Sequence, residues 1–226
     1  MATMLEETEP RQSEERSTRL PAWTPIDLAA RFGAIPMARL RHNRDWGQAT
    51  EADVVALEAR NEKSLCELID GVLVEKAMGS RESQIAVCLL TILWSFVRPR
   101  NLGLILATDG MLRFPNGRVY LPDITFIARD RLPGGELPDS AITPIVPDLC
   151  VEIVSRSNSA TEIDAKTADY FAHGVREVWL VRPVEKTLTV LAAGVEPRVF
   201  GETDRFAAGT ILPGLEFTVG ELFATR

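Results

Sequence analysis

Two acidic residues interrupt apolar segments of this 226-residue chain. Asp123 lies in "LPDITFI" and Glu152 lies in "CVEIV", and most neighbours of both are Ile, Leu, Val or Phe. A buried carboxylate without a partner costs several kcal/mol or is neutralised by a shift of its pKa. A shared divalent cation explains both acids, because Mg²⁺ prefers oxygen ligands and keeps waters or substrate phosphate in its remaining positions. The pair therefore predicts a divalent-cation site.

The alternative for each acid is a position at the end of a strand, where solvent, backbone amides or an arginine satisfies the carboxylate. The dipeptide Pro-Asp occurs as Pro122-Asp123 and as Pro147-Asp148, and either could be a turn at the entry of a strand. We keep this interpretation for Asp148. Glu152 fits it less well, because it lies four residues further along the same strand.

A lysine and a third acid lie on predicted helices near these strands. Lys166 shares a helix face with Ile163 and Tyr170, and this is the face expected to meet the sheet. Its alternative is a surface ion pair with Glu162, which precedes it by four residues. Glu82 lies in the first turn of another helix, where the helix dipole alone favours an acid.

The pattern of the chain predicts the elements that must position these residues. The segment "LCELIDGVLVEKA" is typical of a β-hairpin around Asp-Gly, so we interpret Glu67 and Asp70 as hairpin residues. A helix is expected over residues 80–97, and a second over 160–173, ended by Gly174. The expected strands are "LGLILATDG", "RVYLPDITFIARD", "VPDLCVEIVS", "EVWLVRP" and "TLTVLAAG", and the tail "AGTILPGLEFTVGELF" can pack as an edge. This order indicates an α/β or α+β fold with a mixed sheet flanked by helices.

Composition divides the chain into three parts. Residues 1–22 are polar and charged, which predicts a disordered tail. Residues 23–60 are interpreted as a helical extension, with a helix in "TEADVVALEARN" and Thr50 as its N-cap. Residues 61–226 form the expected main domain.

The overall composition limits the classes of function. The net charge of −7 argues against non-specific coating of nucleic acid, so DNA contact needs a local basic face. The three cysteines lie apart among apolar neighbours and are expected to be reduced core thiols. The longest apolar run is shorter than the ~20 residues that span a bilayer, and the polar N-terminus is unlike a signal peptide. We therefore expect a cytoplasmic protein without membrane contact.

Several of these segments together carry a family resemblance. The series "ELIDGVLVEK", "LPDITFI", "PDLCVEIVS", "DAKTADYFAHGVREVWLV" and "LPGLEF" resembles the Uma-type "putative restriction endonuclease" family of the PD-(D/E)xK nuclease superfamily, over about residues 50–226. The resemblance implies a restriction-endonuclease-like core with a Mg²⁺-dependent phosphodiesterase site, in which Mn²⁺ can substitute. It also implies a nucleic-acid substrate, with DNA favoured over RNA. Cutting both strands would favour a homodimer.

The resemblance assigns roles to the residues singled out above. Asp123 and Glu152 match the two metal-binding acids, and Glu82 matches an acid that some relatives carry on the first helix. The superfamily lysine, two residues after the second acid, is replaced here by Val154, and Lys166 is the expected substitute. Many relatives also have a histidine near Glu82, where this chain has Ser83 and Gln84. The departures leave open a nuclease-fold binding or scaffold module without turnover. A glycosidase with paired carboxylates is disfavoured by the 7% content of aromatic residues.

Overall fold

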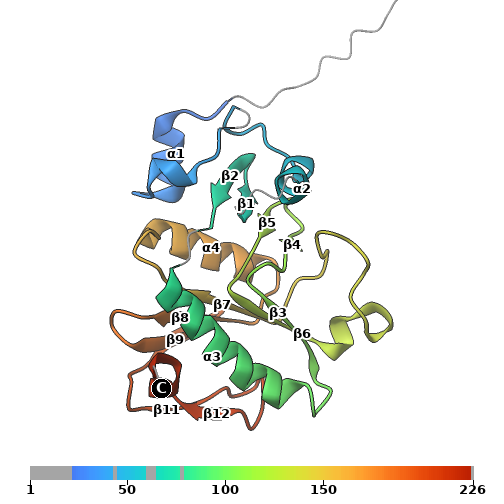
Figure 1. Cartoon of the computed structure of the whole chain (residues 1–226), viewed down its shortest axis with the longest axis vertical. Coiled ribbons are helices and arrows are strands. Elements are labelled where there is room, and N and C mark those ends of the chain that lie inside the picture. Colours follow the sequence, from blue (N-terminus) through green and yellow to red (C-terminus); the bar gives the residue numbers. More distant parts are fainter. Residues whose placement is uncertain (1–21, 43–44, 60–64, 77–78, 225–226) are drawn as a thin grey trace, which may run out of the picture.

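The computed structural model describes residues 22–42, 45–59, 65–76 and 79–224 (Figure 1). The expected tail, residues 1–22, lies outside the described residues except for Ala22. None of the helices in the described ranges has the length and apolar character needed to cross a membrane.

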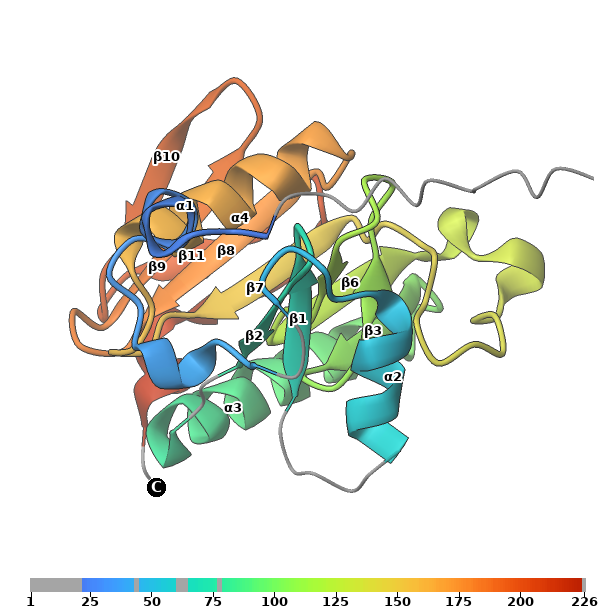
Figure 2. The same cartoon turned by 90° about the horizontal axis from the view of Figure 1, so that it is seen from above.

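A six-stranded mixed sheet in the order β10-β9-β8-β7-β6-β3 forms the centre of the protein (Figure 2). β7 and β8 are parallel, and the other neighbouring pairs are antiparallel. Every residue of β7 is buried, because helices cover both faces of the sheet (Figure 1). The expected mixed α/β class is confirmed. The strands are β3 (Gly103–Ala107), β6 (Ile124–Ala128), β7 (Leu149–Ile153), β8 (Glu177–Arg182), β9 (Thr187–Ala192) and β10 (Val195–Phe200).

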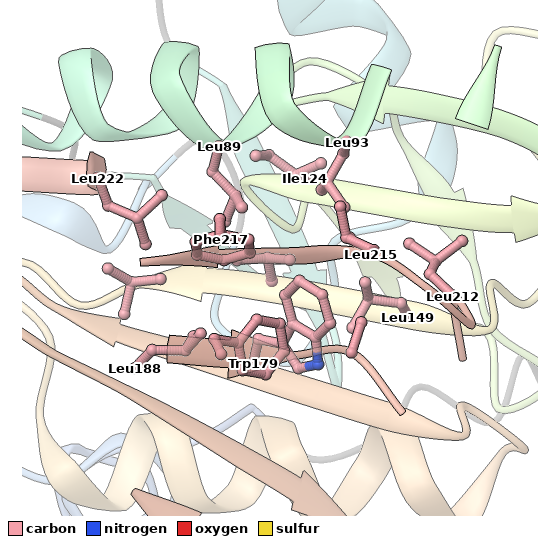
Figure 3. Close-up of a cluster of buried hydrophobic side chains, with 14 of the residues drawn as sticks. Leu89, Leu93, Ile124, Leu149, Trp179, Leu188, Leu212, Leu215, Phe217 and Leu222 are labelled. Carbon is pink, nitrogen blue, oxygen red and sulfur yellow. The ribbon is translucent and has the colours of Figure 1, made fainter. Parts of the chain in front are cut away.

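One face of the sheet is covered by α3 (Ser80–Val97) and by the C-terminal segment (Figure 3). α3 has the predicted bounds, and its Leu89 and Leu93 are completely buried against the sheet. The C-terminal segment contains β11 (Arg205–Ala207), β12 (Glu216–Thr218) and the 3₁₀-helix η4 (Val219–Phe223). The prediction that this tail forms a sheet edge is wrong. β11 and β12 pair with each other, and Leu212 and Phe217 are buried on the sheet face, while β10 and β3 are the edge strands of the central sheet.

The other face is covered by α4 (Ala160–Ala172) and by a smaller sheet in the order β2-β1-β5-β4. α4 agrees with the prediction: the side chain of Ser159 caps its N-terminus, and Gly174 follows its end with a φ of 97°. The predicted hairpin also forms, with Asp70 and Gly71 at φ values of 51° and 77° in its turn. The strands of the smaller sheet are β1 (Cys66–Ile69), β2 (Val72–Glu75), β4 (Leu112–Arg113) and β5 (Val119–Tyr120).

The segment expected to be one strand, "RVYLPDITFIARD", is divided between the two sheets. β5 belongs to the smaller sheet and β6 to the central one, and the chain crosses between them at Leu121-Pro122-Asp123. Proline has no N–H to donate to a ladder, which favours an interruption at Pro122. Asp123 therefore lies in the bend directly before β6 and not inside a strand.

The N-terminal elements α1 (Pro25–Phe32), η1 (Met37–Arg39) and α2 (Glu51–Ala59) pack on the same side as the smaller sheet (Figure 1). Leu28 and Phe32 of α1 are buried in the core that α4 also lines. α2 begins after Thr50, whose hydroxyl donates to Asp53 at 2.8 Å, so the predicted helix is confirmed.

A buried ion pair joins η1 to α4. Arg39 donates two hydrogen bonds to the Glu162 carboxylate, at 2.9 and 2.7 Å, and both side chains are buried. Glu162 is thus the partner of Arg39 and not of Lys166. Burial alone raises the pKa of Glu162, but the hydrogen bonds and charge of Arg39 outweigh it and hold the pKa below its ordinary value.

We expect Glu162→Gln to lower the free energy of unfolding by about 2–3 kcal/mol at neutral pH, because it leaves the Arg39 charge buried without its partner. A depressed carboxyl pKa stabilises the fold above the unfolded-state value of 4.5, and this contribution is lost as the pH falls through the folded-state value. Urea unfolding of both proteins at several pH values checks this. The difference should shrink below pH 4.5, and a difference that grows there would contradict the assignment.

Candidate active site

Asp123 and Glu152 lie opposite each other on neighbouring segments, directly before β6 and near the end of β7. The antiparallel register pairs Ile124 with Val151, and one step further it brings Asp123 opposite Glu152. Directly opposed residues on antiparallel strands have Cβ atoms about 5 Å apart and share a face. Ile153 belongs to the core on the α3 side, so Glu152 points toward α4, since side chains alternate along a strand.

The Asp123 carboxylate is buried, and both of its oxygens have partners. Oδ2 accepts a hydrogen bond of 2.6 Å from the backbone N–H of Ile153. Oδ1 lies 2.9 Å from Nζ of Lys76, which directly follows β2. The neighbouring strand and the hairpin thus hold Asp123 in one orientation.

Glu152 belongs to a second buried ion pair, with α4. Its Oε1 lies 2.9 Å from Nζ of Lys166 and accepts a hydrogen bond of 2.7 Å from the Tyr170 hydroxyl. Lys166 also lies 2.7 Å from Oε1 of Glu67 in β1. The helix face that carries Ile163, Lys166 and Tyr170 therefore meets the sheet.

Glu67 and Lys76 were not among the predicted site residues. Both bind the backbone of Leu121, the residue at which the chain crosses between the sheets: the N–H of Leu121 donates to Glu67 at 2.9 Å, and its carbonyl accepts from Lys76. A glutamate inside a strand with four buried residues is the same signal that identified Glu152. The prediction that Glu67 is a hairpin residue is correct, because it lies in β1. That prediction did not include the ion pair between Glu67 and Lys166.

Three carboxylates and two ammonium groups form one cluster, and all of them are nearly inaccessible to solvent. The members of the cluster are Glu67, Lys76, Asp123, Glu152 and Lys166. Burial raises the pKa of Glu152 above its ordinary value, and the charges of Lys166 and Lys76 oppose this shift. For Lys166, burial lowers the pKa, but the charges of Glu152 and Glu67 outweigh it, so the pKa is raised and the ammonium form is favoured. With every group ionised, the cluster keeps one uncompensated negative charge.

The donor set of this cluster fits a magnesium ion. Mg²⁺ is typically held by one or two carboxylates, with substrate phosphate and waters as its other ligands. Asp123 and Glu152 supply two such carboxylates, and each already has a cationic group within 2.9 Å. The described ranges contain no group of three or more His, Cys, Asp or Glu side chains arranged around a metal position. A closed structural site of the zinc type is therefore not found in that part of the chain.

The remaining acids lie elsewhere. Asp148 is at the entry of β7, as expected, where its carboxylate accepts from the N–H of Ala128 at 2.8 Å and pairs with Arg131 at 3.0 Å. Glu82 is in the first turn of α3, and its Oε2 lies against the backbone of Gly79. No contact joins Glu82 to Asp123 or Glu152 in the described structure. Glu82 lines a separate cavity of about 440 Å³ beyond the end of β7.

The prediction that the cysteines are core residues holds for two of the three, and Cys88 is only half-buried. Cys66, Cys88 and Cys150 are all free, and Cys66 and Cys150 are buried. Burial raises the pKa of the Cys66 thiol to about 11, so it is protonated at neutral pH.

Comparison with known proteins identifies related sequences and folds. A model of the Uma2 family, described as "Putative restriction endonuclease", matches residues 52–220. A crystal structure described as "a putative nuclease belonging to DUF820 from Anabaena variabilis" has a similar fold, with a TM-score of 0.63 and 24% sequence identity. The match covers 70% of this chain and 89% of that chain. No curated protein matches this chain significantly.

Proposed function

Because the chain belongs to the Uma2 family, described as "Putative restriction endonuclease", we propose that it is a Mg²⁺-dependent endonuclease that hydrolyses phosphodiester bonds in DNA. The observation that carries this proposal is the opposed pair Asp123 and Glu152, buried together with two lysines. Buried acids are costly unless positive charge compensates them, and the two lysines leave one negative charge of the three carboxylates Glu67, Asp123 and Glu152 for a bound cation to balance. If these side chains only stabilised the fold, apolar residues of similar volume would do so without the free-energy cost of removing charges from water.

Each site residue would have a separate role in catalysis. Asp123 and Glu152 hold the metal ion, with the backbone carbonyl of Ile153 as a further oxygen ligand. Mg²⁺ when bound polarises the scissile phosphate and lowers the pKa of a coordinated water. Lys166 keeps Glu152 in place, orients the attacking water and offsets the negative charge that develops on the phosphate. Mn²⁺ is expected to substitute for Mg²⁺.

Residues around the site would support these roles. Glu67 holds Lys166 from the hairpin, and the Tyr170 hydroxyl fixes one oxygen of Glu152. Glu82 lines the cavity beyond β7, and from there it would contribute a further carboxylate for a second metal ion or for the surroundings of the first. Each site hydrolyses one phosphodiester bond, so double-strand cleavage would need a homodimer that presents two sites.

Incubation with plasmid DNA tests the proposal directly. The full-length chain should convert supercoiled DNA to nicked or linear forms with Mg²⁺ or Mn²⁺, and EDTA should stop the reaction. A Glu152→Ala variant prepared in the same way excludes a contaminating nuclease. Equal cutting by that variant would refute the assignment, and a parallel reaction with RNA decides between the two nucleic acids.

One observation favours a binding module without turnover as the alternative function. Lys76 places its ammonium group 2.9 Å from Asp123, where it competes electrostatically with a bound cation. If Lys76 closes the site permanently, the fold could bind a partner without performing catalysis. Calorimetric titration with Mg²⁺ separates the two functions, since an inactive module would bind none or would bind equally after Asp123→Ala.

We expect Lys76→Met to tighten Mg²⁺ binding by about tenfold or more. Two unit charges about 4 Å apart interact by about 4 kcal/mol at an effective dielectric constant of 20, so removal of the lysine favours the incoming cation. The variant also leaves Asp123 without a counter-charge, which acts in the same direction. Calorimetry measures the change, with Lys186→Met as a control on an exposed lysine that pairs with Glu202. Weaker binding by Lys76→Met would show that Lys76 supports the metal site.

A further inference from the structure

A cavity opens where β7 and β8 end, directly beyond Glu152. These two parallel strands finish at the same edge of the sheet, and the residues that follow them line the cavity together with the first turn of α3. Its volume of about 440 Å³ lies within the usual range for ligand sites. Val154 lines it two residues after Glu152, which is about 7 Å along an extended chain.

Three arginines from different elements converge on this cavity. Arg81 comes from α3, Arg156 from the loop after β7, and Arg182 from the end of β8. None of the three forms an ion pair with another described residue. Arg81 is anchored by a hydrogen bond of 2.5 Å to the carbonyl of Pro183, and Arg182 contacts the Thr189 hydroxyl at 3.4 Å. Arg156 is exposed. The guanidinium groups therefore keep most of their donors for a ligand.

The two acids of the cavity offset these charges only in part. Glu185 is exposed in the turn after β8, and Glu82 folds back over Gly79 at the N-terminus of α3. Gly79 has no side chain to cap that helix, so the partial positive charge of the helix end compensates Glu82. A net positive lining remains in a protein whose overall charge is −7.

We propose that this cavity is the groove that binds the phosphodiester backbone of DNA next to the bond being cleaved, through Arg81, Arg156 and Arg182. The inference rests on the proposed function and specifies which surface holds its substrate. Arginine forms planar, bidentate hydrogen bonds with phosphate oxygens, which suits backbone recognition without reading of bases. The groove also supplies the local basic face that an acidic protein needs to bind DNA.

Binding in EDTA tests the groove separately from catalysis. The fluorescence anisotropy of a short labelled DNA duplex is measured with the full-length protein and with Arg156→Gln, Arg182→Gln and the double variant. Each single change is expected to weaken binding several-fold, and the double variant at least tenfold. The dependence of log K on log salt should become shallower by about 0.9 for each phosphate that a variant no longer neutralises.

Arg100→Gln is the matched control, because it removes an exposed arginine beyond the far end of α3, and that end of the helix, at Val97, is about 24 Å from Arg81. It should bind DNA within twofold of the parent. Equal urea midpoints for all variants show that the fold is retained. Unchanged affinity in the double variant, or an equal loss in Arg100→Gln, would overturn the proposal. Displacement of the duplex by millimolar inorganic phosphate at matched ionic strength would also overturn it, because the groove would then be a site for single anions.

Asp123→Asn separates this proposal from the proposed function. The variant should bind the duplex in EDTA as tightly as the parent while failing to cleave it with Mg²⁺. If the parent binds DNA through the arginines but cuts nothing, the endonuclease assignment fails and the groove stands. If the parent cuts DNA and the arginine variants bind normally, the groove fails and the endonuclease assignment stands.

Discussion

Asp123→Asn is expected to reduce Mg²⁺-dependent cleavage of DNA, per folded molecule, by a factor on the order of 10³ or more. The metal supplies several kcal/mol of transition-state stabilisation, and each 1.4 kcal/mol corresponds to about tenfold in rate. Asparagine has the same shape as aspartate, and its carbonyl oxygen can still accept the hydrogen bond from Ile153. What it lacks is the charge that would hold the cation. Single-turnover cleavage of a labelled duplex measures the effect.

Asp148→Asn is a matched control for this experiment. Asp148 also follows a proline and is equally buried, and its carboxylate also accepts from a backbone N–H and pairs with a cationic side chain. It lies at the opposite end of β7 from Glu152, at the entry of the strand. The control should lose stability but should cleave DNA within a few-fold of the parent, per folded molecule. If both variants lose cleavage equally, Asp123 has a structural role like that of Asp148.

Lys166→Met is expected to lower the free energy of unfolding by about 3–5 kcal/mol. Removing one partner of a buried ion pair leaves an uncompensated charge, and Lys166 is the partner of two carboxylates, Glu67 and Glu152. Methionine keeps much of the side-chain volume, so the loss reports the charge more than the packing. Urea unfolding at neutral pH measures it.

Two further variants define the origin of this loss. Lys186→Met removes a lysine that pairs with Glu202 at 2.6 Å, but those side chains are 44% and 47% exposed, so the expected cost is below about 1 kcal/mol. Adding Glu67→Gln to Lys166→Met removes one of the two unpaired acids and should recover part of the stability. A cost for Lys166→Met that is no larger than that for Lys186→Met would rule out a buried network.

Local patterns in the sequence predicted most of the elements. The helix over 80–97 follows from apolar residues at helical spacing, and the hairpin follows from the Asp-Gly turn between two apolar runs. These signals are local, because the period of the side chains and the backbone freedom of a turn depend on a few neighbouring residues. The same kind of signal indicated that Glu152 lies in a buried strand and that Lys166 faces the sheet.

The errors concern which segments meet in space. "RVYLPDITFIARD" has strand character throughout, but alternation along the chain does not indicate that its two halves join different sheets. The C-terminal tail has apolar positions that suit either a sheet edge or a sheet face, and the core under α3 decided between them. Such choices depend on packing between distant segments.

By itself, the sequence determined the types of the chemical groups, the mixed α/β class and the candidate acids Asp123 and Glu152, because apolar surroundings make a lone carboxylate stand out. Tertiary structure alone decided how these acids are compensated. The register of β6 and β7 brings Asp123 opposite Glu152, and the folding of the hairpin over α4 brings Lys76 and Glu67 into the same cluster. Charges interact through space over a few ångströms. The charged residues of this cluster are spread along the sequence from Glu67 to Lys166, and they come that close only when both sheets and α4 have packed.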